Sequence, residues 1–339
     1  MGANKFLLVK GIAGLGNRIM FLLSALLYAR LSGRRTLVDW CDGQYAGYGC
    51  NAFPLLFEST SVDSLADLPE HGSVEPPLWQ GRLQHSAREM WRTDVHSRTW
   101  SPEEGWRTYT FDLSRLDQPE DILVGWSFYQ QVDPIRPLLT GPYAVWRRRS
   151  SMWILRQIMQ QDLLPHSEVA DRAQHIRQAS FQPKMIGVHL RYTDRKSNPK
   201  AFHRRLSSLL ETDAQSGVFL ATDSLEVERE FRSRYPNVVT AAKWLPDANV
   251  PMHRQDDCPD PLEMARSAVL DMCLLGACQQ LIVDTRSSFS CVASLMSAAD
   301  ERDIYDLNPA RLVPPRLRHA LWLAGVRASY KWKKWNGPQ

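Results

Sequence analysis

Apolar runs and polar loops alternate along much of the chain, as is typical of strands joined by helices. An apolar strand over Phe6–Lys10 leads through a loop with three glycines to an apolar helix from about Asn17 to Ser32, and a second strand follows at Thr36–Val38. Short, continuously apolar strands are typical of sheets that are covered on both faces. This order of elements predicts the start of a parallel sheet.

The alternation is weak between residues 46 and 141, where Ile122–Trp126 is the clearest strand, and becomes regular further on. Strands that alternate with helices predict an α/β protein with a doubly wound parallel sheet. The strands predicted in the second half are Met185–His189, Val218–Ala221, Val238–Thr240, Leu281–Val283 and Ile304–Tyr305, and the helices are Trp153–Leu164, Glu168–Ala179, Phe202–Thr212, Leu225–Arg234, Pro261–Ala277 and Phe289–Ala298.

Composition narrows the class of protein. The 339 residues suffice for two domains, and 44% hydrophobic with 23% charged residues is typical of globular proteins. Lys and Arg exceed Asp and Glu by only four, 41 against 37. That excess is too small to indicate binding to nucleic acid, so no such partner is predicted.

Cysteine usage and apolar run lengths bear on the compartment. The six cysteines form no Cys-x-x-Cys pair, so no zinc site is predicted. Cys41 and Cys50 could form a disulfide in an oxidising compartment, but nothing in the sequence indicates export. The run Phe6–Val9 is too short for a signal peptide, and Ile19–Leu31 is too short to span a bilayer. We therefore expect a cytoplasmic protein.

The strand that starts at Met185 ends in a polar cluster of His189, Arg191 and Asp194. Polar residues at a strand end are typical of ligand sites in open α/β sheets. His189 and Arg191 are two residues apart, so they point to the same side while the strand continues. A guanidinium there suits a phosphate, because its planar donors match the phosphate oxygens. The alternatives are a buried core histidine and a structural ion pair between Arg191 and Asp194.

Two turns that precede helices are candidates for binding a phosphate. Gly11, Gly14 and Gly16 lack the spacing of a dinucleotide-binding motif, but they permit close approach to an anion, with Arg18 beside a diphosphate or an acceptor. In the second half, the backbone N–H groups and hydroxyls of residues 287–290 form a possible phosphate cradle. The alternatives are an ordinary strand–helix turn and an ordinary serine cap.

The segment Ala221–Ser224 follows another strand and opens a helix. Asp223 could accept hydrogen bonds from the N–H edge of guanine, as carboxylates do from base amino groups. The alternative is that Asp223 or Ser224 caps the following helix.

Six segments, taken in order, resemble the α-1,6-fucosyltransferase family of rhizobial nodulation enzymes and eukaryotic core fucosyltransferases. The resemblance spans roughly residues 5 to 305. The segments are GLGNRI at Gly14–Ile19, TLVDW at Thr36–Trp40, NAFPLLFE at Asn51–Glu58, GVHLRYTD at Gly187–Asp194, ATDS at Ala221–Ser224 and DMCLLGACQQLIV with SSFS at Asp271–Ser290.

The resemblance implies a GT-B-like fold, in which two Rossmann-type domains with parallel sheets face a cleft. It also implies GDP-fucose as the donor, inversion at the sugar, no metal ion and no other cofactor, and a glycan or lipid-linked glycan as the acceptor. We expect an N-terminal domain on the acceptor side over residues 1–165, a nucleotide-sugar-binding domain over 166–315 and a basic tail over 316–339. Donor binding would fall to Gly14, Gly16, Arg18, His189, Arg191, Thr222, Asp223, Asp271, Ser287, Ser288, Phe289 and Ser290.

The resemblance also implies individual roles. Arg191 would bind the β-phosphate and stabilise the departing GDP, which fits the need of a metal-free site for fixed cations where charge develops. His189 and Asp223 would hold the guanine or ribose end, and residues 287–290 would bind the diphosphate.

The chain departs from the family at two positions. Tyr192 replaces a second arginine, and Pro199 replaces the glutamate proposed as the base in the eukaryotic enzymes. Asp194 is our first candidate for the base, because it lies next to the phosphate-binding arginine; the alternative is that it pairs with Arg195 or a backbone N–H. A transferase for another GDP-sugar and a non-catalytic sugar-nucleotide-binding protein remain as alternative functions.

The C-terminal tail is basic. No acidic residue follows Asp306, whereas seven Lys or Arg residues and three tryptophans do. Such a segment can lie on the inner face of an anionic membrane, where a lipid-linked acceptor would be found. The alternative is a final helix packed on the other domain with a solvated basic end.

Overall fold

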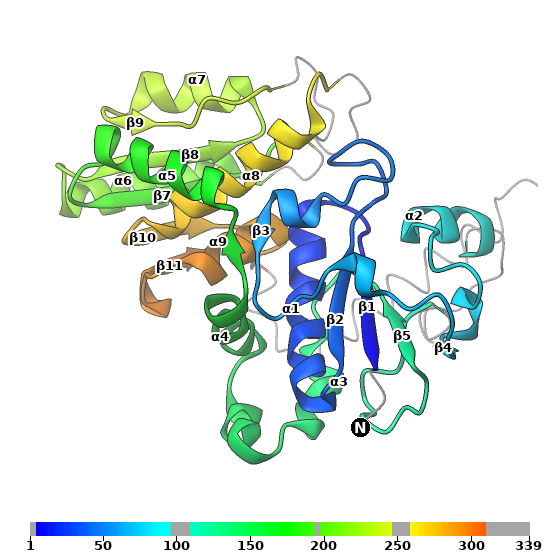
Figure 1. Cartoon of the computed structure of the whole chain (residues 1–339). Coiled ribbons are helices and arrows are strands. Elements are labelled where there is room, and N and C mark those ends of the chain that lie inside the picture. Colours follow the sequence, from blue (N-terminus) through cyan, green and yellow to red (C-terminus); the bar gives the residue numbers. More distant parts are fainter. Residues whose placement is uncertain (1–4, 96–108, 194–196, 246–257, 310–339) are drawn as a thin grey trace, which may run out of the picture.

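Two parallel sheets with helices packed on their faces make up the computed structural model, which describes residues 5–95, 109–193, 197–245 and 258–309 (Figure 1). The first sheet has the strand order β2-β1-β5-β4 and the second has the order β11-β10-β7-β8-β9. The first contains β1 (Phe6–Lys10), β2 (Arg35–Asp39), β4 (Val74–Glu75) and β5 (Ile122–Gly125), and the second contains β7 (Met185–Leu190), β8 (Gly217–Thr222), β9 (Val238–Val239), β10 (Gln280–Val283) and β11 (Ile304–Asp306). A short antiparallel pair joins β3 (Phe57–Glu58) to β6 (Leu164–Pro165).

The order of the second sheet reverses between β7 and β10. The chain runs outward from β7 to β8 and β9, and then places β10 on the other side of β7. Open α/β sheets bind ligands beyond the carboxyl ends of the strands at such a reversal. His189 pairs with Ala221 and Leu190 pairs with Thr222, so β7 and β8 end level with each other. The polar residues that follow both strands therefore emerge at the same edge.

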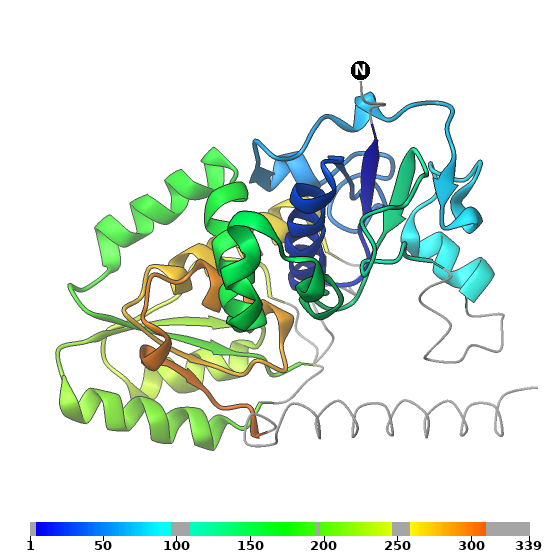
Figure 2. The same ribbon diagram turned by 90° about the horizontal axis from the view of Figure 1, so that it is seen from below.

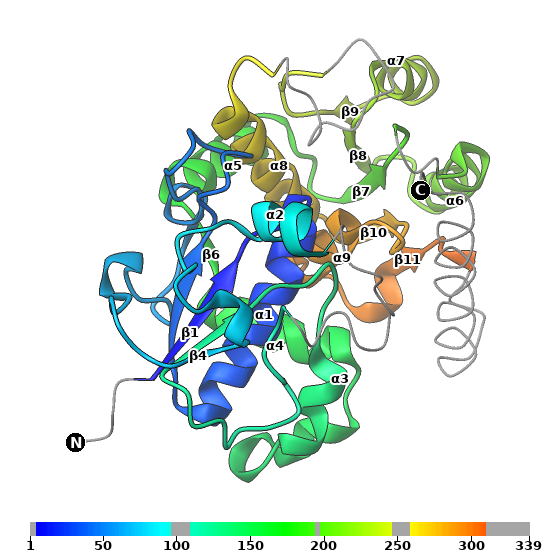
Figure 3. The same cartoon turned by 90° about the vertical axis from the view of Figure 1, so that its right-hand side faces the viewer.

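Helix α1 (Leu15–Ser32) lies between the two halves of the molecule. It packs against β1 and β2 and also against α4 and α9 (Figures 2 and 3). This position explains its almost continuously apolar sequence, because a helix buried on all sides needs no polar face. It ends at Gly33, whose φ of 69° is left-handed and whose N–H donates to the carbonyl of Ala29.

The remaining helices cover the sheets or join them. The helices α4 and α5 lie between the two halves in sequence, and α5 packs against α8. Their bounds are α2 (Ala87–Met90), α3 (Val132–Ile135), α4 (Ser151–Asp162), α5 (Ser167–Ser180), α6 (Pro199–Thr212), α7 (Leu225–Arg234), α8 (Pro261–Gly276) and α9 (Ser288–Met296).

The predicted α/β class is confirmed, and each strand and helix predicted from the sequence is present within a few residues of its predicted ends. The short elements β3, β4, β6, α2 and α3 were not predicted. The division at residues 165 and 315 stays a prediction, and the basic tail lies outside the described residues. No helix in the described part of the chain is both long and apolar enough to cross a membrane.

Candidate active site

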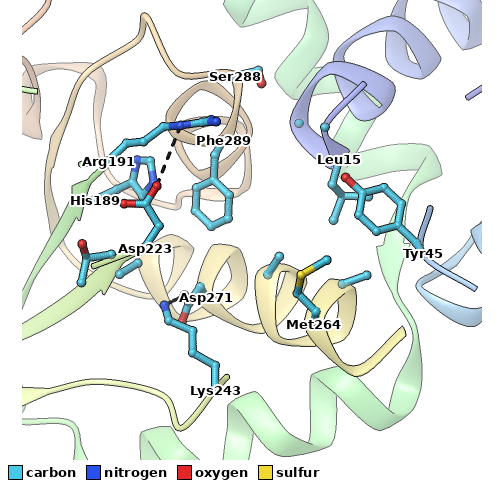
Figure 4. A pocket seen from close by; sticks show the side chains of 16 residues that line it. Leu15, Tyr45, His189, Arg191, Asp223, Lys243, Met264, Asp271, Ser288 and Phe289 are labelled. Carbon is cyan, nitrogen blue, oxygen red and sulfur yellow. Dashed lines mark hydrogen bonds and ion pairs between the residues drawn. The ribbon is translucent and has the colours of Figure 1, made fainter. Parts of the chain in front are cut away.

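A pocket lies where the edge of the second sheet faces the start of α1 (Figure 4). Concave sites with apolar walls and a few polar groups are where proteins bind small molecules. Nine of the twelve predicted donor-binding residues line it: Gly14, Gly16, His189, Arg191, Thr222, Asp223, Asp271, Ser288 and Phe289. Its other lining residues, which the sequence did not single out for binding, are Leu15, Tyr45, Ala221, Lys243, Met264, Ala265 and Ala268.

His189 is held in the pocket wall by two neighbours from α9. Its Nδ1 lies 2.6 Å from Oγ of Ser290, and its ring stacks on Phe289 with the centroids 4.4 Å apart. Burial, together with the positive charges of Arg191 and Lys243, lowers the pKa of His189 to about 3, so the ring is neutral. Ser290 Oγ also accepts from the N–H of Asp284, so this hydroxyl links His189 to the end of β10.

Asp223 ties the end of β7 to the end of β8. One oxygen accepts from the backbone N–H of Tyr192 at 2.7 Å, and the other accepts from Oγ1 of Thr193 at 2.6 Å. Arg191 Nε lies 4.0 Å from the same carboxylate. These contacts favour a role for Asp223 in positioning Arg191 over direct contact with guanine. Ser224 caps α7 by accepting from the N–H of Val227, as the alternative expectation stated.

The first turns of α1 and α9 touch at the pocket. A Cβ added at Gly16 would lie 2.7 Å from the carbonyl carbon of Ser288 and 2.8 Å from the nitrogen of Phe289, so the contact requires glycine. Ser287 precedes α9 and makes no side-chain cap, and its Oγ is buried without a hydrogen-bond partner in the described structure. Two helix N-termini therefore face the pocket, and both favour an anion.

Lys243 and Asp271 form a buried ion pair in the pocket wall. Nζ of Lys243 donates to Oδ2 of Asp271, and their side chains are 7% and 4% exposed. Oδ1 of Asp271 is buried without a hydrogen-bond partner in the described structure. An unpaired buried oxygen costs about 1–3 kcal/mol, which a ligand that donates to it would recover.

Arg18 does not line the pocket, although the sequence suggested contact with a diphosphate or an acceptor. Its guanidinium is fully buried and makes two hydrogen bonds to Asp42, with one each to Gln44 and the carbonyl of Ala13. The same group stacks over Tyr45, with 4.8 Å from its carbon to the ring centroid. Arg18 thus fixes the loop that carries Tyr45 into the pocket.

Three other expectations concern residues away from the pocket wall. Ser287 and Ser290 lie at the start of α9, behind Ser288 and Phe289. Asp194 lies outside the described residues, so its proposed role as the base stays a prediction.

All six cysteines are free thiols. No three His, Cys, Asp or Glu side chains of the described residues are placed to hold a metal ion.

The chain is similar in sequence to a curated protein and similar in fold to solved structures. No protein-family model matches the chain. Nodulation protein Z of Sinorhizobium fredii is 25% identical over 337 residues, covering 91% of this chain and 96% of that protein. Two crystal structures share the fold. One is NodZ α-1,6-fucosyltransferase soaked with GDP-fucose, with 22% identity, a TM-score of 0.59 and 87% and 93% of the two chains covered. The other is a mutant of Arabidopsis thaliana FUT1 in complex with GDP, with 16% identity, a TM-score of 0.56 and 87% and 69% of the two chains covered.

Proposed function

We propose that this chain, which resembles the α-1,6-fucosyltransferase family, transfers L-fucose from GDP-fucose to a glycan hydroxyl, with an α-1,6-like linkage. The relationship to nodulation protein Z along 91% of the chain supports this reaction, as does the shared fold with structures soaked with GDP-fucose or bound to GDP. The observation that carries the proposal is the convergence of Arg191 and the α9 N-terminus on one pocket at the strand reversal.

The diphosphate would lie between Arg191 and the first turn of α9. Backbone N–H groups at the start of this helix and the hydroxyl of Ser288 face the pocket, and Gly16 allows α1 to approach from the other side. These donors suit phosphate oxygens, because a helix N-terminus offers unpaired N–H groups and a positive potential. Arg191 adds a permanent positive charge at the pocket edge.

The guanine end would lie against Asp271. Guanine presents two neighbouring N–H donors, and the buried Oδ1 of Asp271 is an acceptor in need of a donor. Asp223 has both oxygens engaged with the backbone of Tyr192 and the hydroxyl of Thr193. We therefore assign base recognition to Asp271 rather than Asp223, and assign Nε2 of His189 to the ribose or base.

The reaction then follows from where charge develops. The acceptor oxygen attacks C1 of fucose from the face opposite the diphosphate, the bond from C1 to the β-phosphate oxygen breaks, and the electron pair leaves on GDP. This displacement inverts the configuration at C1. Arg191 and the α9 N–H groups are pre-positioned where the leaving oxygen gains charge, so they stabilise the transition state more than the bound donor. Fixed cations of this kind do the work that a metal ion does in other transferases.

A general base has to take the proton of the acceptor hydroxyl, and a carboxylate can serve as one. The two carboxylates that line the pocket are engaged: Asp223 with Tyr192 and Thr193, and Asp271 with Lys243. Asp194 directly follows the Thr193 that Asp223 anchors, so we propose Asp194 as the base.

Asp194→Asn should lower kcat by about 100-fold and leave the Kd for GDP unchanged, because a base acts on the acceptor and not on the nucleotide. Steady-state transfer assays and calorimetric GDP titration measure the two quantities. Unchanged kcat would remove Asp194 from the mechanism while leaving the donor site intact.

A donor screen tests the function itself. GDP-fucose, GDP-mannose and UDP-sugars are added with EDTA, and thermal unfolding and sugar transfer to glycan acceptors are followed. We expect GDP-fucose to stabilise the protein, by about 2.7 kcal/mol at a concentration of 100 Kd, and to be turned over. Transfer from GDP-mannose alone would change the donor, a requirement for Mg²⁺ would contradict metal independence, and GDP binding without any turnover would indicate a binding protein.

The setting of the reaction belongs to the same proposal. Six free thiols fit a reducing cytoplasm, and a lipid-linked glycan would bring the protein to the inner face of a membrane. Flotation of the intact protein and of a variant lacking the basic tail with anionic vesicles tests that contact. Equal flotation of the two would exclude a role for the tail.

A further inference from the structure

The ion pair between Lys243 and Asp271 joins two pocket residues from different segments of the chain. Lys243 follows β9, whereas Asp271 lies in the middle of α8. Both line the pocket, and Nζ of Lys243 binds one carboxylate oxygen while the other has no partner in the described structure (Figure 4). Lys243 thus engages one oxygen of Asp271, and the other oxygen has no hydrogen-bond partner in the described structure.

The charge of Asp271 decides which base the pocket can accept. An ionised carboxylate only accepts hydrogen bonds, so it matches the two N–H donors of guanine. A protonated carboxyl donates one hydrogen bond and accepts one, which is the pattern that matches the ring nitrogen and amino group of adenine. A pocket specific for guanine therefore has to keep Asp271 ionised.

Burial works against that ionisation. It raises the pKa of Asp271 above its usual range, and the Lys243 ammonium lowers it again. Glu228 of α7 raises it slightly further. Four other charged or titratable side chains line the pocket. They are His189 in β7, Arg191 just after β7, Asp223 just after β8, and Tyr45, which lies opposite α8 (Figure 4).

We infer that Lys243 is the positioning residue that makes the donor site specific for guanine. Its ammonium compensates the charge of Asp271 inside the wall and occupies Oδ2, which directs Oδ1 to the base. The inference rests on the proposed function only in that the donor carries guanine. A purely structural pair would tie the segment after β9 to α8 without any effect on which nucleotide binds.

The test measures the Kd values of GDP and ADP by calorimetry from pH 5.5 to 9 in the full-length protein and in three variants. Lys243→Met removes the ammonium, Lys243→Arg keeps the positive charge, and the double variant Lys243→Met/Asp271→Asn removes both charges. The double variant leaves no buried unpaired charge, so it controls for a loss of folding in the first. Thermal unfolding without nucleotide verifies that each variant is folded.

We expect Lys243→Met to weaken GDP binding by about 10- to 100-fold at pH 7, the value of one charge-assisted hydrogen bond, and to narrow the preference for GDP over ADP. GDP affinity is lost as the pH falls through the pKa of Asp271, so this loss should move to higher pH in Lys243→Met. Lys243→Arg should keep the preference for GDP. The double variant should bind GDP and ADP with similar Kd values. Its GDP affinity should not fall with pH in the way that Asp271 causes, because the asparagine in its place does not titrate.

Two outcomes separate the inference from the proposed function. If the unmodified protein prefers GDP and Lys243→Met keeps the same preference and pH profile, Lys243 is structural and only the inference fails. If Lys243→Met does not fold, an unchanged preference for GDP in the double variant overturns the inference, as does a lost preference in Lys243→Arg, which keeps the charge that the inference requires. If the unmodified protein binds no GDP, the proposed donor site itself is wrong.

Discussion

Arg191→Ala is expected to lower kcat/KM for fucosyl transfer by about 1,000-fold while the protein stays folded. The residue follows the last strand position of β7, lines the pocket, and is held 4.0 Å from the carboxylate of Asp223. Its side chain lines the pocket and does not belong to the buried core, so its removal enlarges the pocket and leaves the core intact. In the proposed mechanism the guanidinium stabilises the charge that forms on GDP, so the loss should fall on the step in which GDP departs.

Controls separate this effect from a general loss of positive charge. Arg302→Ala removes an arginine whose side chain is 82% exposed and whose partners are acidic surface residues, so it should leave kcat/KM unchanged. Arg191→Lys keeps the charge but loses the planar fork and should recover only part of the activity. Full activity of Arg191→Ala, measured with saturating acceptor, would show that another group stabilises the leaving diphosphate.

Gly16→Ala is expected to destabilise the protein by about 1–3 kcal/mol and to slow transfer by about 100-fold. The new methyl group would come within 2.8 Å of the backbone of Ser288 and Phe289, which cannot rotate away as a side chain could. The first turns of α1 and α9 must then separate. Since we propose that the N–H groups at the start of α9 bind the diphosphate, this separation should move the donor away from the acceptor.

Gly14 provides the matched control, two residues earlier in the same loop. A Cβ at Gly14 meets nothing within 4 Å, and its backbone has an ordinary φ of −66°. Gly14→Ala should therefore leave the denaturation midpoint unchanged, whereas Gly16→Ala lowers it. Equal stability of the two variants in urea would mean that the contact between α1 and α9 is not the tight one described here.

Most of the second sheet was predictable, because its strands are short apolar runs between helices with clear periods. The ends of α7, for example, were predicted at Leu225 and Arg234, where the structure has them. The pair β3 and β6 was not, since two residues paired across more than a hundred positions leave no local pattern. In the site, the residues at strand and helix ends were predicted, and Tyr45 and Lys243, which loops bring in, were not. Asp271 in the middle of α8 was named only through the family resemblance.

Arg18 and Lys243 show the two ways in which the prediction of the site was wrong. Arg18 was predicted to bind and does not line the pocket, whereas Lys243 lines it and was not predicted. Arg18 stands in a motif that suggests a ligand, yet its guanidinium is taken up by Asp42, which lies 24 residues further on in a loop. Lys243 stands in no recognisable motif and enters the pocket because the segment after β9 passes Asp271, which lies 28 residues later in the sequence, on α8. Both pairings depend on loop paths that a single sequence does not encode locally.

The meeting of two helix N-termini at the pocket has a consequence for the end of the reaction cycle. Each terminus carries roughly half a positive charge, and Arg191 adds a full one. The nucleotide becomes more negative when the sugar leaves, because a bridging phosphate oxygen becomes a terminal one. The features that stabilise the departing group therefore retain the spent nucleotide more tightly than the fresh donor. Turnover would then be limited by product release, and the enzyme would slow as GDP accumulates unless GDP is removed.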